Sequence, residues 1–129
     1  MNILICDDNT AFAMQLEKDI SEYFHNPNMN INVVTDHFDQ IEGTYDVIFM
    51  DIELNDKNGI EIAKYHKDKH NCLVIFTSNH ESLVFNTFQV EPFQFIRKNH
   101  YDYDKNIVFK QLKEKLHTLY ISITLKDSK

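Results

Sequence analysis

The chain has 129 residues, of which 43% are hydrophobic and 26% charged, and this is enough for one domain with a buried core. Its formal net charge of −7 argues against nucleic acid as a ligand of this segment, because phosphate backbones bind basic surfaces. No apolar stretch approaches the roughly 20 residues of a membrane span, and the N-terminus lacks the pattern of a secretory signal. Cys6 and Cys72 fit two separate reduced thiols in a cytoplasmic protein better than a disulfide framework.

Apolar strand-like runs alternate with amphipathic stretches along the chain, which predicts an α/β fold with a parallel sheet between two layers of helices. The expected strands lie at about 2–6, 31–34, 46–50, 73–77 and 93–96. The first run is apolar throughout, as is typical of strands that are covered on both faces. Helices are expected after each strand, at about 10–24, 38–41, 60–65, 82–88 and 104–119.

The residues after the last predicted helix follow a different pattern. Residues 121–125 alternate with a period of two, like the first strand of a further domain. A frayed helix end followed by a polar tail explains the same residues equally well. We therefore assign residues 1–120 to one domain and residues 121–129 to a tail or to the start of a linker.

Polar side chains follow four of the predicted strands. Asp7 and Asp8 come after the first, Asp51 after the third, Thr77 after the fourth and Lys98 after the fifth. Because the carboxyl ends of parallel strands meet at one edge of a sheet, these groups are expected to lie together. Carboxylates are the ligands that Mg²⁺ prefers, and a carboxylate beside the metal can attack phosphorus. The pattern predicts a site for a divalent cation and a phosphoryl group.

Each residue has a predicted role in that site. Asp51 is the nucleophile because it ends the central apolar run, and Asp7 and Asp8 are metal ligands on a strand-to-helix loop. The Lys98 ammonium and a hydroxyl would hold the phosphoryl oxygens. Taken alone, the acidic pair also fits an ordinary helix start, and Arg97 could replace Lys98.

This set of residues resembles the receiver domain of two-component response regulators. The resemblance covers essentially the whole chain and implies a flavodoxin-like, doubly wound (βα)5 fold. It is carried by the pair Asp7-Asp8, Asp51 at the end of IFMD, Gly59 eight residues later, Thr77 at the end of IFTS and Lys98 at the end of FQFIRK.

The resemblance implies a phosphoryl-transfer function. A sensor histidine kinase would phosphorylate Asp51, and the domain would be a signalling switch that catalyses only its own phosphorylation and dephosphorylation. Asp8, Asp51 and the backbone carbonyl of Glu53 would bind Mg²⁺, with Asp7 supporting the site mostly through water. Thr77 would contact the phosphoryl group together with the lysine.

The resemblance also implies a switch and an output. Phe95, three residues before Lys98, occupies the position of the switch aromatic, which would pack behind Thr77 after phosphorylation. The surface formed by the fourth helix, fifth strand and fifth helix often forms a homodimer in this family. Residues 78–98 look most like receiver domains joined to LytTR-type (AgrA-like) DNA-binding domains, which implies control of transcription by a further domain.

Two positions depart from the family pattern. Asn55 stands four residues after Asp51, and Asn99 directly follows Lys98, where the family often has proline. The second departure leaves the approach of Lys98 less rigidly set. Both keep open a degenerate receiver that acts as a protein-interaction module without phosphate.

Other site chemistries fit the sequence less well. A Mg²⁺-dependent phosphohydrolase would need an acid or base beside Asp51, and none is evident. A flavin site is excluded because Asp7 and Asp8 would face the cofactor phosphate. His66 and His70 have the spacing of a metal-binding pair but no evident third ligand, so two exposed histidines are expected.

Overall fold

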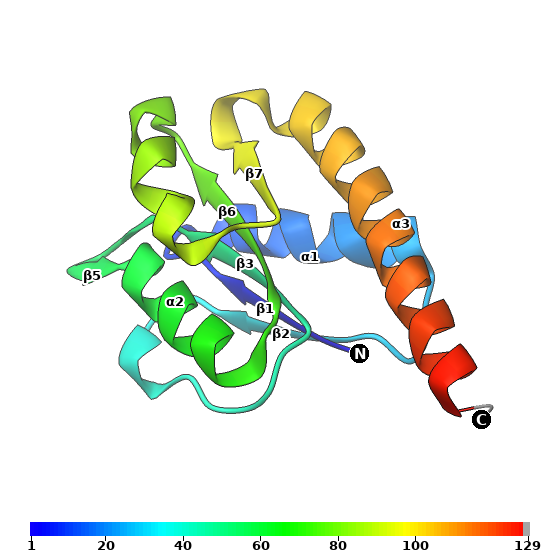
Figure 1. Cartoon of the computed structure of the whole chain (residues 1–129). Helices are drawn as coiled ribbons and strands as arrows, with labels where there is room; N and C mark the ends of the chain where they lie inside the picture. Colours follow the sequence, from blue (N-terminus) through cyan, green and yellow to red (C-terminus); the bar gives the residue numbers. More distant parts are fainter. Residues whose placement is uncertain (128–129) are drawn as a thin grey trace.

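The computed structural model of the protein describes residues 1–127, with side chains described as far as residue 119. Its centre is a five-stranded parallel sheet with the strand order β2-β1-β3-β6-β7 (Figure 1). This is the doubly wound arrangement that the sequence predicts. The strands are β1 (Asn2–Cys6), β2 (Asn30–Val34), β3 (Val47–Asp51), β6 (Leu73–Ser78) and β7 (Gln94–Arg97).

Helices cover both faces of the sheet (Figure 1). Helices α1 (Thr10–Phe24) and α3 (Tyr101–Asp127) pack on one face, and α2 (Gly59–His70) packs on the other with the 3₁₀ helices η1 (Phe38–Gln40) and η2 (Glu81–Val90). Successive residues of each central strand point to opposite faces. In β1, for example, Ile3 and Ile5 face α1 and α3, whereas Leu4 and Cys6 face α2. Strands covered on both faces are apolar throughout, as the sequence analysis expected.

The two long helices after β1 and β3 begin at asparagine caps. The Asn9 side chain accepts a hydrogen bond from the Phe12 amide at 3.1 Å, and the Asn58 side chain accepts one from the Ile60 amide at 2.9 Å. Each cap satisfies one of the amides that the first helical turn leaves free. The caps therefore fix where each chain segment leaves the carboxyl edge of the sheet.

The fourth predicted helix is a 3₁₀ helix instead of an α-helix. In η2, the two buried residues are Thr87 and Val90, three positions apart, which matches three residues per turn. Phe85 and Phe88 lie on the opposite side and are exposed. Branched and aromatic side chains at these positions also disfavour an α-helix.

The structure also differs from one of the two expectations for residues 121–125, a further strand or a helix end. Helix α3 follows the short 3₁₀ helix η3 (Lys98–His100) and continues to Asp127, so residues 121–125 are helical and do not form a strand. A helix satisfies its backbone hydrogen bonds locally, whereas a lone strand needs a partner. The proposed domain boundary near residue 120 is a separate matter and stays a prediction.

Three residues outside the site complete the comparison with the sequence. Cys6 and Cys72 are buried free thiols. His66, which was expected to be exposed, is 4% exposed and packs against the ring of Tyr45. Its position on the inward face of α2, beside Ala63, explains the error, because a polar helix carries one histidine into the core.

No helix in residues 1–127 is long and apolar enough to cross a membrane.

Candidate functional site

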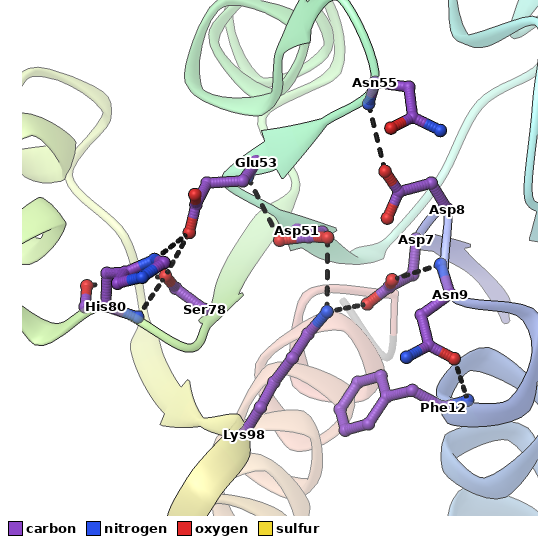
Figure 2. Close-up of polar contacts among 10 residues, drawn as sticks. All are labelled: Asp7, Asp8, Asn9, Phe12, Asp51, Glu53, Asn55, Ser78, His80 and Lys98. Carbon is purple, nitrogen blue, oxygen red and sulfur yellow. Dashed lines mark hydrogen bonds and ion pairs between the residues drawn. The ribbon is translucent and has the colours of Figure 1, made fainter.

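The predicted site residues meet at the carboxyl edge of the sheet (Figure 2). Asp7 directly follows β1, Asp51 is the last residue of β3, and Lys98 directly follows β7. Thr77 lies opposite Asp51 in the register of β3 and β6. The sequence argument from neighbouring strand ends is therefore correct for the arrangement of these residues.

Three carboxylates form the centre of the site. One oxygen of each of Asp7, Asp8 and Asp51 lies within 4.8 Å of the other two. Asp7 and Asp51 are 1% and 3% exposed, whereas Asp8 is partly exposed at the mouth. Buried carboxylates this close repel one another, so the arrangement requires positive charge nearby.

Each carboxylate accepts a hydrogen bond from a backbone amide, and for Asp8 this amide comes from another loop (Figure 2). These bonds orient the carboxylates before any ligand is present, because the amides belong to ordered turns. The pairs are the Asn9 amide with Oδ1 of Asp7 at 2.8 Å, the Asn55 amide with Oδ2 of Asp8 at 3.0 Å, and the Glu53 amide with Oδ1 of Asp51 at 3.1 Å.

The backbone of Asp51 is also fixed by a close approach of Gly59. A Cβ atom at Gly59 would lie 1.9 Å from the Asp51 carbonyl oxygen, so a side chain does not fit there. Between these residues, the chain forms a small hairpin of β4 (Glu53–Leu54) and β5 (Lys57–Asn58), for which the sequence predicted neither a strand nor a helix. The glycine eight residues after Asp51 thus lets α2 start directly beside the site.

Lys98 supplies the positive charge. Its Nζ lies 2.8 Å from Oδ2 of Asp7 and donates a hydrogen bond to Oδ2 of Asp51 at 3.2 Å. The ammonium also lies 4.8 Å from the centroid of the Phe12 ring, which is within the range of a cation–π contact. Arg97, the alternative cation, points away from the carboxylates and pairs with Asp104. The ammonium of the site therefore belongs to Lys98.

Burial and charge shift the protonation of the site. Burial raises the pKa of Asp51, the charge of Asp7 raises it further, and Lys98 and the Glu53 amide offset this only in part, giving a pKa of about 7. Burial opposes the charge of Lys98, but the contacts with Asp7 and Asp51 outweigh it and raise the pKa of this ammonium. In neutral solution, Asp51 is therefore poised between its two forms, and an added cation would favour the carboxylate.

The residues fit a divalent cation of the Mg²⁺ type. The donors are carboxylate oxygens, which hard cations prefer. Oδ2 of Asp7 is buried and, among the described residues, accepts no hydrogen bond of good geometry, although the Lys98 ammonium is close. A buried carboxylate oxygen without a hydrogen bond is suited to a metal or to a metal-bound water. The role of the Glu53 backbone carbonyl as a metal ligand stays a prediction.

Thr77 and Phe95 lie where the predicted switch needs them, but their roles stay predictions. Thr77 is buried, and its carbonyl accepts a hydrogen bond from the Ile52 amide at 3.1 Å. Phe95 pairs in register with Phe76 and packs partly buried against the core on the α2 side of the sheet. The two residues are therefore on adjacent strands, β6 and β7, and Thr77 is the one that lies beside Asp51.

Several site contacts were not predicted from the sequence. Nδ1 of His80 lies 2.5 Å from Oε1 of Glu53, and the His80 amide donates a hydrogen bond to Oγ of Ser78 at 2.9 Å (Figure 2). This network joins the loop after β3 to the loop after β6. The contact between the Lys98 ammonium and the Phe12 ring was not predicted either. These contacts depend on loop conformation, which leaves no periodic signal in the sequence.

Comparisons with known proteins identify relatives of the chain. The family model of the response regulator receiver domain matches residues 3–108. The transcriptional regulatory protein LytR of Staphylococcus aureus (strain N315) is 32% identical over 101 residues, covering 76% of this chain and 41% of that protein. The sensory transduction protein LytR of Staphylococcus epidermidis is 29% identical over 110 residues, covering 76% of this chain and 40% of that protein. The chain thus spans about two fifths of the length of these relatives.

A solved structure has the same fold. The signal receiver domain of a DNA-binding response regulator from Colwellia psychrerythraea 34H superimposes with a TM-score of 0.74. The alignment covers 91% of this chain and 98% of that domain, at 20% sequence identity. The arrangement of strands and helices is therefore that of known receiver domains.

Proposed function

The chain belongs to the response regulator receiver domain family, and on that basis we propose that it is a phosphorylation-controlled switch with Asp51 as the phosphoryl acceptor. The observation that carries the proposal is the group of three carboxylates with the Lys98 ammonium in contact with two of them. Burying such a group of charges costs stability, and groups of this kind cluster at functional sites.

The transfer step uses groups that the site holds in place. An oxygen of Asp51 attacks the phosphorus of a phosphohistidine on a sensor kinase, the P–N bond breaks, and the imidazole leaves as an acyl phosphate forms. Asp8, Asp51 and the Glu53 carbonyl would hold Mg²⁺, with Asp7 acting mostly through water. When bound, the metal offsets negative charge on the phosphoryl oxygens. Lys98, already bonded to Asp51, pairs with one of these oxygens after transfer.

The switch follows from new contacts to the phosphoryl group. The Thr77 hydroxyl moves toward the acyl phosphate, and Phe95 packs into the space behind it. Phosphorylation then shifts a population between two states by the contacts that only one state makes.

The output would be transcription controlled by a further domain. Residues 1–120 form the receiver, and residues 121–129 lead toward a LytTR-type DNA-binding domain in a cytoplasmic regulator. A homodimer would form through η2, β7 and α3. This surface carries a groove of about 490 Å³ lined both by apolar side chains, such as Val84 and Ile107, and by charged ones, such as Glu81, a mixture that suits a second protein chain.

Intact-mass spectrometry tests the phosphoryl transfer. The chain is incubated with acetyl phosphate and Mg²⁺, beside an Asp51→Asn variant and a sample with chelator. We expect one added phosphoryl mass that disappears in the variant and without metal. No adduct on a folded wild-type chain, with a working control receiver, would instead favour the phosphate-independent interaction module.

A further inference from the structure

Lys98 reaches the carboxylates from a segment that lacks an obvious restraint. It begins η3 directly after β7, and Asn99 follows it. Lysine has a long flexible stem, so the direction of its ammonium depends on how firmly its backbone is held. The side chain is nevertheless only 10% exposed and contacts both Asp7 and Asp51.

Asp104 holds the backbone immediately before Lys98. Its Oδ2 accepts hydrogen bonds from the backbone amide and from Nε of Arg97, both at 2.9 Å. Its Oδ1 accepts one from the second guanidinium nitrogen, Nη2, also at 2.9 Å. One carboxylate in the first turn of α3 therefore binds both the main chain and the side chain of the residue that precedes Lys98.

The surroundings make this a firm attachment. Asp104 is 8% exposed, so its carboxylate is largely shielded from water, while the Arg97 side chain is 34% exposed. The hydrogen bonds from Arg97 hold the pKa of Asp104 below its usual range. Nη1 of Arg97 also donates a hydrogen bond to Oε1 of Glu81 at 3.2 Å, which ties η2 to the same point. Charge-assisted, two-point pairing fixes an angle as well as a distance.

We propose that Asp104, acting through Arg97, is a positioning residue that directs Lys98 at Asp7 and Asp51. Asp104 replaces, from the next helix, the restraint that a proline after the lysine would give. The inference rests on the proposed function of the site, in which Lys98 balances the carboxylates and then pairs with the phosphoryl group. Without the attachment, the segment 97–100 relaxes and the ammonium spends part of its time in solvent.

The metal affinity of the site gives a readout that general destabilisation does not reproduce. Lys98 competes with a cation for Asp7 and Asp51, so the loss of its contact should tighten Mg²⁺ binding. We expect Asp104→Asn to lower the Kd for Mg²⁺ by about fivefold and to slow phosphorylation by acetyl phosphate by a similar factor. Calorimetry measures the first, because the chain has no tryptophan, and intact mass measures the second.

A matched control lies in the same helical turn. Asp102 is 93% exposed and pairs only with Lys105 among the described residues, at 3.5 Å. Asp102→Asn removes the same charge from the same helix end without touching Arg97, so it should leave both measurements unchanged. An equal effect of Asp102→Asn and Asp104→Asn would overturn the proposal.

A double-mutant cycle with Lys98→Ala decides whether Asp104 acts through Lys98. In the Lys98→Ala background, Asp104→Asn should cause no further change in Mg²⁺ affinity or phosphorylation rate. The same change in both backgrounds would show a merely structural role. Thermal unfolding verifies that each variant is folded. If Asp104→Asn is unfolded, Arg97→Lys takes its place, since lysine keeps the charge but loses the two-point pairing.

The cycle separates this inference from the proposed function. A wild-type chain that takes no phosphoryl group would refute the proposed function, while the Mg²⁺ titrations would still determine whether Asp104 acts through Lys98. A wild-type chain that is phosphorylated, with Asp104→Asn additive to Lys98→Ala, would refute the positioning role alone.

Discussion

Replacing Asp51 by asparagine should stabilise the metal-free domain at neutral and alkaline pH. Burial and the charge of Asp7 raise the pKa of Asp51 from 3.8 to about 7 in the folded chain. Between these two values, the folded state holds a proton that the unfolded state has lost, so stability falls as the pH rises through this window. Above the folded pKa, the full loss of stability is present. A neutral asparagine of the same shape avoids this loss.

The size of the effect follows from the shift. About three pKa units correspond to about 4 kcal/mol, and some of this will be lost to relaxation of the site, which leaves about 2–4 kcal/mol. For a domain of this size, that is roughly 10 °C in Tm.

The assay is urea unfolding followed by circular dichroism, with chelator present, at pH 4.5 and pH 8. The Asp51→Asn variant should exceed the wild type at pH 8, and the gap should shrink at pH 4.5, where Asp51 is protonated in the folded state. Titrating groups far from the site cancel in the difference between the two proteins. The reasoning is refuted by a variant no more stable than the wild type at pH 8, or by a gap that does not depend on pH.

Three further changes test other parts of the site and its support. Gly59→Ala should destabilise the chain by about 3 kcal/mol in chemical unfolding, because its Cβ would lie 1.9 Å from the Asp51 carbonyl oxygen; unchanged stability would mean that α2 shifts freely. Mg²⁺ at about 100 times its Kd should stabilise the wild type by about 2.7 kcal/mol, and Asp8→Asn should abolish most of the gain in a thermal-shift assay; an equal gain would remove Asp8 from the metal site. Burial tends to raise the pKa of Asp19, but hydrogen bonds, with Tyr101 foremost, lower it. The stability that Asp19 contributes is therefore present above its unfolded pKa and is lost as the pH falls through its folded pKa. Asp19→Asn should therefore cost about 1 kcal/mol at pH 7 and less at pH 3, and a loss equal at both values would contradict this assignment.

The sequence predicts the sheet well because buried parallel strands are continuous apolar runs between helical patterns. It predicts the wrong type for η2, because its buried positions, Thr87 and Val90, are three residues apart, a spacing that α-helices and 3₁₀ helices share. It leaves residues 121–125 undecided, because alternation alone does not supply a partner strand. Chain continuity with α3 decided the outcome in favour of a helix.

The site was predictable where it depends on strand ends. Asp7, Asp51 and Lys98 follow strands that are neighbours in the sheet, so their meeting is a consequence of topology. The choice between Arg97 and Lys98 also had an unused signal. Side chains alternate along β7, and Ile96 faces the side of α1 and α3, so the residue two positions later continues toward Phe12. The bonds of Asp104 and His80 had no such signal, because they depend on the path of two loops.

The placement of charge in this fold works against stability and in favour of switching. Asp7 and Asp51 are buried together, and Lys98 balances them only in part, as the raised pKa of Asp51 indicates. A ligand shifts an equilibrium only by the difference in its affinity for the two states. A site with unbalanced buried carboxylates gains more from a cation than a fully neutralised site would. In the proposed mechanism, the same lysine that contacts Asp7 and Asp51 in the resting site would exchange Asp51 for the phosphoryl oxygens. Asp104 and Glu81 both bind Arg97, the residue before Lys98, and His80 directly precedes η2, so these contacts connect the site to the surface formed by η2, β7 and α3.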